Sequence, residues 1–162
     1  MASSYAVTRP ASPQTNEGNL SIVIVADTAL QRRCRTILAA DHLASRGVSL
    51  AGACRLLRRH RPRVLLLDAA RCPRRALGAV PVLKHLSPET GVVLLGRRRA
   101  PTTLLMDAVR RGAWGHVATR DLSRDLPKAV RVVAARQSWL PRRLCAAIIA
   151  ELVARSPAEE RD

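Results

Sequence analysis

Two aspartates each follow a short apolar run, and their positions are the first sign of a functional site in this sequence. Asp27 follows the run 22–26, and Asp68 follows the run 64–67. Runs of this kind are typical of strands buried on both faces of a parallel sheet. Ligands of such sheets bind at the carboxyl ends of the strands. A carboxylate there can also simply cap a helix or pair with arginine, and the sequence leaves these roles open.

Strand and helix patterns alternate around these aspartates. Strands are predicted at residues 22–26, 64–67, 92–95 and, more weakly, 114–118; the ambiguous stretch 41–49 could hold a short strand around 42–45. Helices are predicted over about 30–38, 50–59, from near Pro81, 102–112, from a cap at Ser123 to 133, and 141–154. The alternation predicts an α/β fold, a doubly wound five-stranded parallel sheet with an extra C-terminal helix. It would bring residues 27–28, 68, 96–97 and 119–120 to one edge.

Composition divides the chain into four segments. Residues 1–19 are rich in Ser, Thr, Pro, Asn and Gly and are expected to form a flexible tail. Residues 20–137 hold the α/β domain, residues 138–155 a C-terminal or linker helix, and residues 156–162 a charged, loose tail.

The charge is strongly positive. The chain has 28 basic and 12 acidic residues, a net charge of +16, and only Lys84 and Lys128 are lysines. Arginine pairs well with phosphate, so nucleic acid or another polyanion is one expected partner. Alternatively, a genome biased towards Arg codons raises the arginine content of any solvated face. Aromatic residues make up 2% of the chain, so nothing supports a stacking surface for single-stranded nucleic acid.

Several function classes find no support in the motifs. Cys34, Cys54, Cys72 and Cys145 form no C-x-x-C pair, and we interpret them as small buried residues in a reducing compartment rather than zinc ligands. No nucleophile elbow, P-loop or metal-binding motif is present, so no enzymatic activity is expected. No apolar run approaches the roughly 20 residues of a membrane span. No secretory signal opens the chain. We expect a cytoplasmic protein without membrane contact.

Five segments in the same order resemble the receiver domain of response regulators, in the NarL/LuxR-type branch. They are IVIVADT (22–28), RPRVLLLDA (61–69), GVVLLGRR (91–98), DAVRRGAWGHVATRDL (107–122) and LPKAVRVVAARQSWLPRRL (126–144). The resemblance covers about residues 21–153. It implies a CheY-like, flavodoxin-like sheet for the receiver-like segment 20–137.

The phosphorylation pocket of that family has five key positions, and the resemblance indicates a degenerate pocket here. Asp27 matches the first of two acidic residues that hold Mg²⁺, and Asp68 matches the phosphate acceptor. Thr28, Gly96 and Thr119 stand in place of the second acidic residue, the hydroxyl residue and the lysine. Because a carboxylate and a lysine charge are lost, we expect neither Mg²⁺ binding nor ordinary phosphotransfer, and no cofactor.

Other residues near this pocket are candidates for a different mechanism. His116 stands where the family often has a tyrosine that rotates as a switch. Arginines follow the predicted strands 64–67, 92–95 and 114–118: Arg71, Arg74, Arg75, Arg97, Arg98, Arg99 and Arg120. Arg97, Arg98 and Arg120 are the candidates for binding an anion or replacing the metal's charge. Arg97 is the first choice to pair with Asp68, which would fix one conformation without phosphate.

The resemblance implies an atypical response regulator of a two-component system. It would act in transcription regulation independently of Asp phosphorylation, through dimerisation or ligand binding. Its partners would be a second copy, and DNA through a helix-turn-helix domain that is attached or missing. Leu144, Ile148 and Leu152 are the candidate dimer surface, although this stripe could equally pack on its own domain or link two domains. The alternatives are an anion or small-molecule sensor with an arginine-lined pocket, or direct nucleic-acid binding by the basic surface.

Overall fold

The computed structural model describes residues 22–156, so the predicted tail 1–19 and residues 157–162 of the other tail lie outside the described part. Five strands form one parallel sheet in the order β2-β1-β3-β4-β5. They are β1 (Ile22–Val25), β2 (Ser45–Val48), β3 (Val64–Asp68), β4 (Gly91–Gly96) and β5 (Ala113–Ala118). The helices are α1 (Thr28–Ala40), α2 (Leu50–His60), α3 (Pro73–Leu86), α4 (Thr102–Arg110), α5 (Leu122–Ala134) and α6 (Arg142–Arg155), with a 3₁₀ helix, η1 (Thr119–Asp121). The predicted doubly wound five-stranded parallel sheet is confirmed.

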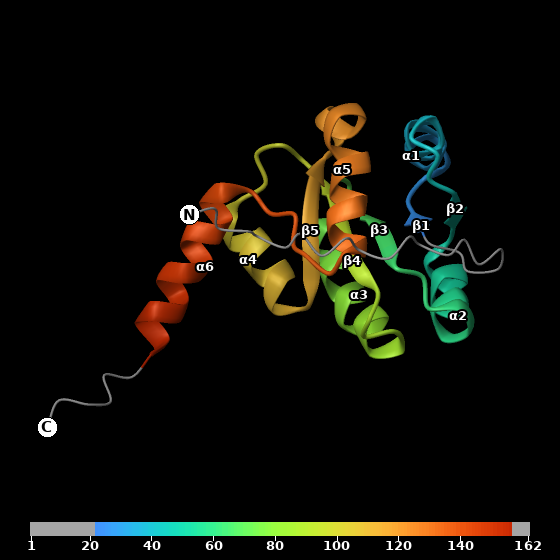
Figure 1. Cartoon of the computed structure of the whole chain (residues 1–162). Coiled ribbons are helices and arrows are strands. Elements are labelled where there is room, and N and C mark those ends of the chain that lie inside the picture. Colours follow the sequence, from blue (N-terminus) through green and yellow to red (C-terminus); the bar gives the residue numbers. More distant parts are fainter. Residues whose placement is uncertain (1–21, 157–162) are drawn as a thin grey trace, which may run out of the picture.

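Helices cover both faces of the sheet because the strands are apolar on both sides. In Figure 1, α1 and α5 lie on one face, and α2, α3 and α4 lie on the other. Ile24 and Leu66 pack with Cys34 of α1 in the first layer, whereas Val23 and Leu65 pack in the second. The strand order reverses between β1 and β3, and such a switch point opens a crevice at the carboxyl ends of these two strands. Asp27 and Asp68 stand at that crevice.

Two predicted boundaries were wrong for reasons of local geometry. The third helix begins at Pro73, and Pro81 lies inside it. A proline is well suited to the first helical turn, and the buried residues Leu77, Val80 and Leu83 hold the helix on the sheet although Pro81 lacks an N–H. The second strand is shifted to Ser45–Val48, because the chain first leaves α1 through His42 in a left-handed conformation, with φ 58°.

The start of the fifth helix also differs from the prediction. Ser123 does not cap α5; it lies in the first turn, exposed, after η1 has already turned the chain. The helix is anchored by the buried Leu122 and Leu126 instead. Packing of these leucines against the sheet therefore decides where the helix begins, and the polar cap does not.

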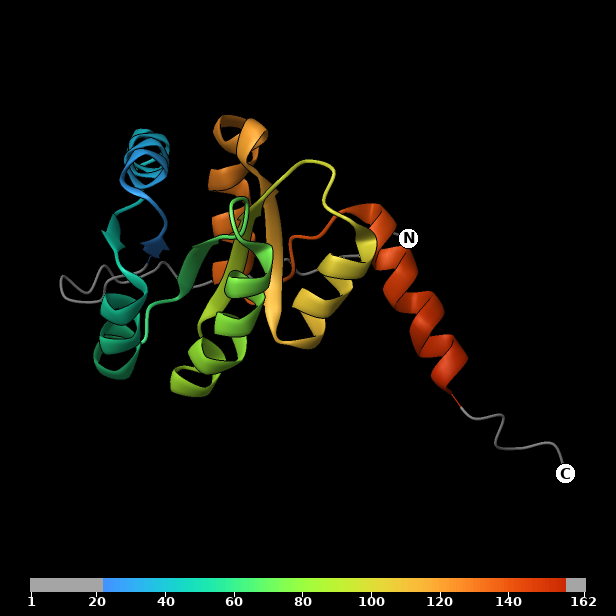
Figure 2. The ribbon, with the colours of Figure 1, turned by 180° about the vertical axis from the view of Figure 1, so that it is seen from behind.

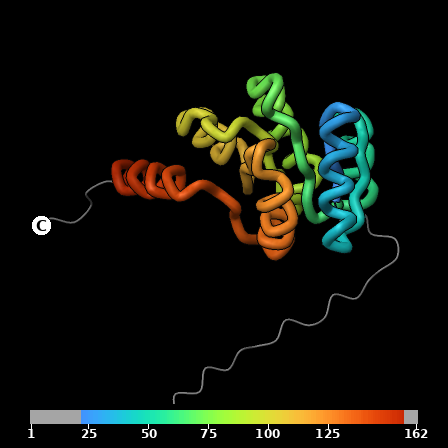
Figure 3. Tube along the Cα trace, turned by 90° about the horizontal axis from the view of Figure 1, so that it is seen from above, coloured from blue at the N-terminus to red at the C-terminus, as the bar shows by residue number. Residues whose placement is uncertain are grey.

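The segment before α6 extends the sheet at its β5 edge. The Trp139 N–H donates to Trp114 O, and the His116 N–H donates to Trp139 O, both at 3.0 Å. Beyond this bridge, α6 runs beside α4 (Figure 2), and its C-terminal part projects from the molecule (Figure 3). Within residues 22–156, every helix is too short or too polar to span a membrane.

Candidate functional site

Asp27 is already engaged by two partners at the end of β1. Its Oδ1 accepts a hydrogen bond from the Leu30 N–H at 2.8 Å, which makes it the N-cap of α1. Its Oδ2 lies 3.5 Å from Nη1 of Arg71, in the loop between β3 and α3. Thr28, the first residue of α1, is exposed. The carboxylate thus caps a helix and faces an arginine.

Asp68 lies next to Asp27 in the fold, because β1 and β3 are paired up to Val25 and Leu67. It is the last residue of β3 and is half-buried. Its Oδ1 accepts a hydrogen bond from the Ala70 N–H at 2.9 Å, which tightens the following turn. The structure therefore brings the two predicted aspartates together at the crevice.

The predicted pairing of Arg97 with Asp68 was wrong. Arg97 is exposed, no ion pair joins it to Asp68, and its carbonyl accepts from Ala100 N in a turn that leads away from the sheet. Arg71 approaches the pocket instead, since its loop leaves β3 directly beside Asp27. Arg98 lies 3.9 Å from Asp121, and Arg120 is exposed. The short distance in sequence between Asp68 and Arg71 was the available signal for this.

The remaining acceptor and cation positions supply little to the pocket. Thr119 begins η1 and is half-buried, so no positive charge stands where the family has its lysine. In the described part of the chain, no group of three His, Cys, Asp or Glu side chains gathers around a common point. Two carboxylates remain at the crevice, but the positive charge of Arg71 beside Asp27 opposes the binding of a divalent cation there.

Gly96 and His116 share the space of a side chain that the family pocket contains. Gly96 is buried at the end of β4, and a Cβ placed on it would lie 2.6 Å from Nε2 of His116. His116 is 8% exposed, and the Nε2 of its ring has no hydrogen-bond partner within residues 22–156. Burial lowers the pKa of His116, and the charge of Arg143 lowers it further. The imidazole is therefore held neutral over Gly96.

Arg143 is a residue of this region that sequence reasoning missed. It lies on α6, and its Nη2 donates to the carbonyl of Ala100, in the loop between β4 and α4, at 2.8 Å. After burial, the charge of Arg143 is the second cause that lowers the pKa of His116. No periodic pattern could have found this contact, because it joins residues far apart in sequence. It connects α6 to the pocket.

The predicted dimer stripe on α6 is divided between interior and surface. Leu144 is fully buried against Ala100 and Leu105, and Ile148 packs against the same cluster. Leu144 is therefore not a free dimer surface, because α4 already covers it. Leu152 remains 61% exposed, beside the exposed Ile149 and Val153.

The cysteines differ from the prediction as well. Cys34 is buried, and burial raises the pKa of its thiol to about 11, with Asp68 raising it further and Arg33 opposing the shift. Cys54 is half-buried, whereas Cys72 and Cys145 are exposed. Only Cys34 thus fits the prediction of a buried, unreactive thiol; Cys72 precedes α3 in a surface loop, and Cys145 lies on the outer side of α6.

Comparison with known proteins supports the fold through structure rather than sequence. No family model and no curated protein matches the sequence. The isolated REC domain of RcsB from Salmonella enterica serovar Typhimurium matches with a TM-score of 0.69 at 17% identity, over 81% of this chain and 99% of that chain. A LuxR family DNA-binding response regulator from Silicibacter pomeroyi matches with a TM-score of 0.64 at 21% identity, over 77% of this chain and 98% of that chain. The chain has the receiver fold of response regulators.

Proposed function

We propose that this chain is a non-enzymatic receiver module that regulates without phosphorylation of Asp68. The observation that carries the proposal is the ion pair between Arg71 and Asp27, at 3.5 Å. A guanidinium beside the first acidic residue offers the positive charge that a bound Mg²⁺ supplies in an active receiver. With the uncharged Thr28 and Thr119 at the other two charged positions, Arg71 balances one of the two carboxylates without metal, and Asp27, Asp68 and Arg71 together keep a single negative charge.

The proposed module has a fixed switch. The resemblance puts a hydroxyl residue at the position of Gly96 and a rotating aromatic switch at that of His116, but here Gly96 has no side chain to move and the His116 ring lies where a Cβ on Gly96 would point. The backbone of His116 also bonds to Trp139 in the linker, and Arg143 ties α6 to the loop after β4. The pocket, the β5 edge and α6 would then form one unit whose state is read by partners of α6.

Transcription regulation is the proposed context for this unit. The structural matches include a protein described as a LuxR family DNA-binding response regulator and structures of RcsB described in terms of DNA interaction. By this analogy of fold, DNA would be contacted by a helix-turn-helix domain attached to this module or supplied separately. Dimerisation through α6 would bring two such domains together.

Beryllofluoride with Mg²⁺ is the test, because it mimics the acyl phosphate of receivers. We expect no Mg²⁺-dependent change in the amide NMR signals of Asp68 and its neighbours, and no phosphorylated protein by mass spectrometry after treatment with acetyl phosphate. A receiver domain that keeps all five pocket residues serves as the positive control. A Mg²⁺-dependent response at Asp68 would overturn the proposal.

A further inference from the structure

A second concave site lies at the opposite end of the sheet from the two aspartates. It is a pocket of about 440 Å³ where the C-terminal ends of α2 and α5 meet the starts of β3 and β4. Its lining residues are Arg59, His60, Arg61, Pro62, Arg63, Glu89, Val133, Ala134 and Arg136. The volume lies in the range of small-molecule sites. This pocket is lined by other arginines than the predicted Arg97, Arg98 and Arg120, and it lies at the amino ends of the strands rather than at their carboxyl ends.

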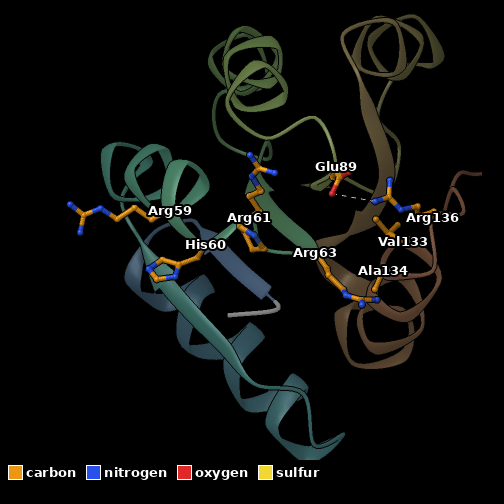
Figure 4. Close-up of a pocket in the computed structure, with 9 residues that line it drawn as sticks. Arg59, His60, Arg61, Arg63, Glu89, Val133, Ala134 and Arg136 are labelled. Atoms are coloured by element: carbon orange, nitrogen blue, oxygen red, sulfur yellow. Dashed lines mark ion pairs between the residues drawn. The ribbon is translucent and has the colours of Figure 1, made fainter. Parts of the chain in front are cut away.

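The pocket carries an excess of positive charge. In Figure 4 the side chain of Arg136 lies toward Glu89, that of Arg63 lies beside Ala134 and that of Arg61 points to a third side, whereas Arg59 extends away from the others. Glu89 is the single acidic residue of the lining, and its Oε2 lies 3.6 Å from Nη2 of Arg136. One carboxylate cannot neutralise three guanidinium groups. An anion with several negative charges would neutralise the remaining positive charge of the pocket.

Two of these arginines stand in an unusual backbone conformation. Arg61 has φ 43° and Arg136 has φ 63°. Both positions follow the C-terminal end of a helix, where glycine or asparagine usually takes the left-handed conformation. A long side chain is disfavoured there, and strained backbone of this kind is concentrated at functional sites. Both arginines with this disfavoured backbone conformation line the same pocket.

A purely structural role of these arginines has a different signature. Cations near the last turn of a helix stabilise its free carbonyl groups, and His60 and Arg59 already stand in the last turn of α2. That role needs positive charge near each helix end but no common cavity. It also predicts a loss of stability when the arginines are removed.

We propose that this pocket binds a small molecule that carries two or more phosphate groups. Arg61, Arg63 and Arg136 would bind the phosphate oxygens through paired N–H donors, and Glu89 would release Arg136 when the ligand enters. The concave shape and the limited volume favour a small ligand over a duplex, which needs an extended basic surface. The site does not depend on the proposed role of Asp68, so either proposal can fail alone.

The test is calorimetric titration of the whole chain with tripolyphosphate and with ATP, at about physiological ionic strength. We expect saturable binding of at least one of them, and binding of ATP alone would identify a nucleotide rather than an inorganic polyphosphate. The double variant Arg61→Gly/Arg136→Gly should lower the affinity by about tenfold or by a larger factor. Its Tm should be unchanged or higher, because glycine favours the left-handed backbone at both positions.

Two matched variants complete the experiment. Arg58→Gln removes one positive charge from an exposed residue in the last turn of α2 that does not line the pocket and should leave the affinity nearly unchanged, whereas Glu89→Gln removes the competing carboxylate and should tighten binding several-fold. The absence of saturable binding to the wild-type chain would overturn the proposal. So would equal weakening by Arg58→Gln, or a duplex oligonucleotide that binds more tightly than either small anion through the same arginines.

Discussion

The absent side chain of Gly96 and the ring of His116 can be tested as a pair. Gly96→Ala would place a Cβ 2.6 Å from Nε2 of the buried imidazole, so the ring must move. Overpacking of this kind destabilises a folded protein by about 1–3 kcal/mol. We expect Gly96→Ala to reduce the free energy of unfolding by this amount in urea titrations. In a His116→Ala background the same change should cost clearly less, and equal costs in both backgrounds would contradict the shared space.

His116 also makes the stability depend on pH. Its pKa is lowered in the folded state, so the unfolded chain takes up the proton first as the pH falls. The stability contributed by the neutral ring is complete above the ordinary value of about 6.5 and is lost as the pH falls below it. We expect the drop in Tm between about pH 8 and pH 5.5 to be smaller in His116→Phe than in the wild type. An equal drop in both proteins would show that other groups cause it.

Individual contacts were predictable only where chain order dictates them. Asp27 and Asp68 follow two strands that must be neighbours, so their meeting at one crevice could be inferred from the apolar runs. The partner of the pocket carboxylates could not, because the path of the loop decides that Arg71 approaches and Arg97 turns away. The contact of Arg143 with Ala100 could not be predicted for the same reason, since it depends on where α6 docks.

At the scale of elements, the alternation of apolar runs and amphipathic stretches was sufficient for the order of strands and helices. It failed where tertiary packing outweighs a local signal. Pro81 reads as a helix start, yet the buried face of α3 continues through it from Pro73. The strand β2 carries only a weak apolar pattern, because it is an edge strand that pairs with β1 alone. Periodicity does not reveal such boundaries.

The docking of α6 rests on Leu144 more than on charge. Leu144 is 0% exposed between Ala100 and Leu105, whereas the ion pair of Arg110 with Glu151 lies near the surface. Leu144→Ala should reduce the free energy of unfolding by about 2–5 kcal/mol if α6 stays docked and leaves a cavity at this position. Because α6 lies at the margin of the fold, we expect part of this loss to appear as faster hydrogen exchange in α6. Cys145→Ala, at an exposed position on the same helix that is outside the proposed dimer surface, is the control and should change neither quantity.

At the scale of the whole molecule, the two ends of the sheet have different characters. The carboxyl ends hold a pocket with two aspartates, one of which faces Arg71. The amino ends hold an arginine-rich pocket with a single carboxylate. A net charge of +16 alone could not distinguish a general polyanion surface from such a site. The fold distinguishes these two possibilities, because it brings Arg136 from the end of α5 to the same cavity as Arg61 and Arg63.

The exposed end of α6 leads to a prediction about assembly. Four large apolar side chains within residues 22–156 are exposed, and three of them lie on α6: Ile149, Leu152 and Val153. Their spacing places them on one side of the helix, beyond the part that α4 covers. A second copy of α6 is the partner we expect, because two-fold pairing buries the same apolar side chains on both chains at once.

Light scattering coupled to size-exclusion chromatography measures this assembly directly. We expect a wild-type dimer that becomes a monomer in the double variant Ile149→Glu/Val153→Glu, since charges would have to be buried at the helix pair. The fourth exposed apolar residue, Val82 on α3, provides the control: it is 54% exposed, and Val82→Glu should leave the dimer intact. A wild-type monomer at micromolar concentration, or a dimer that survives the double change, would exclude α6 as the interface.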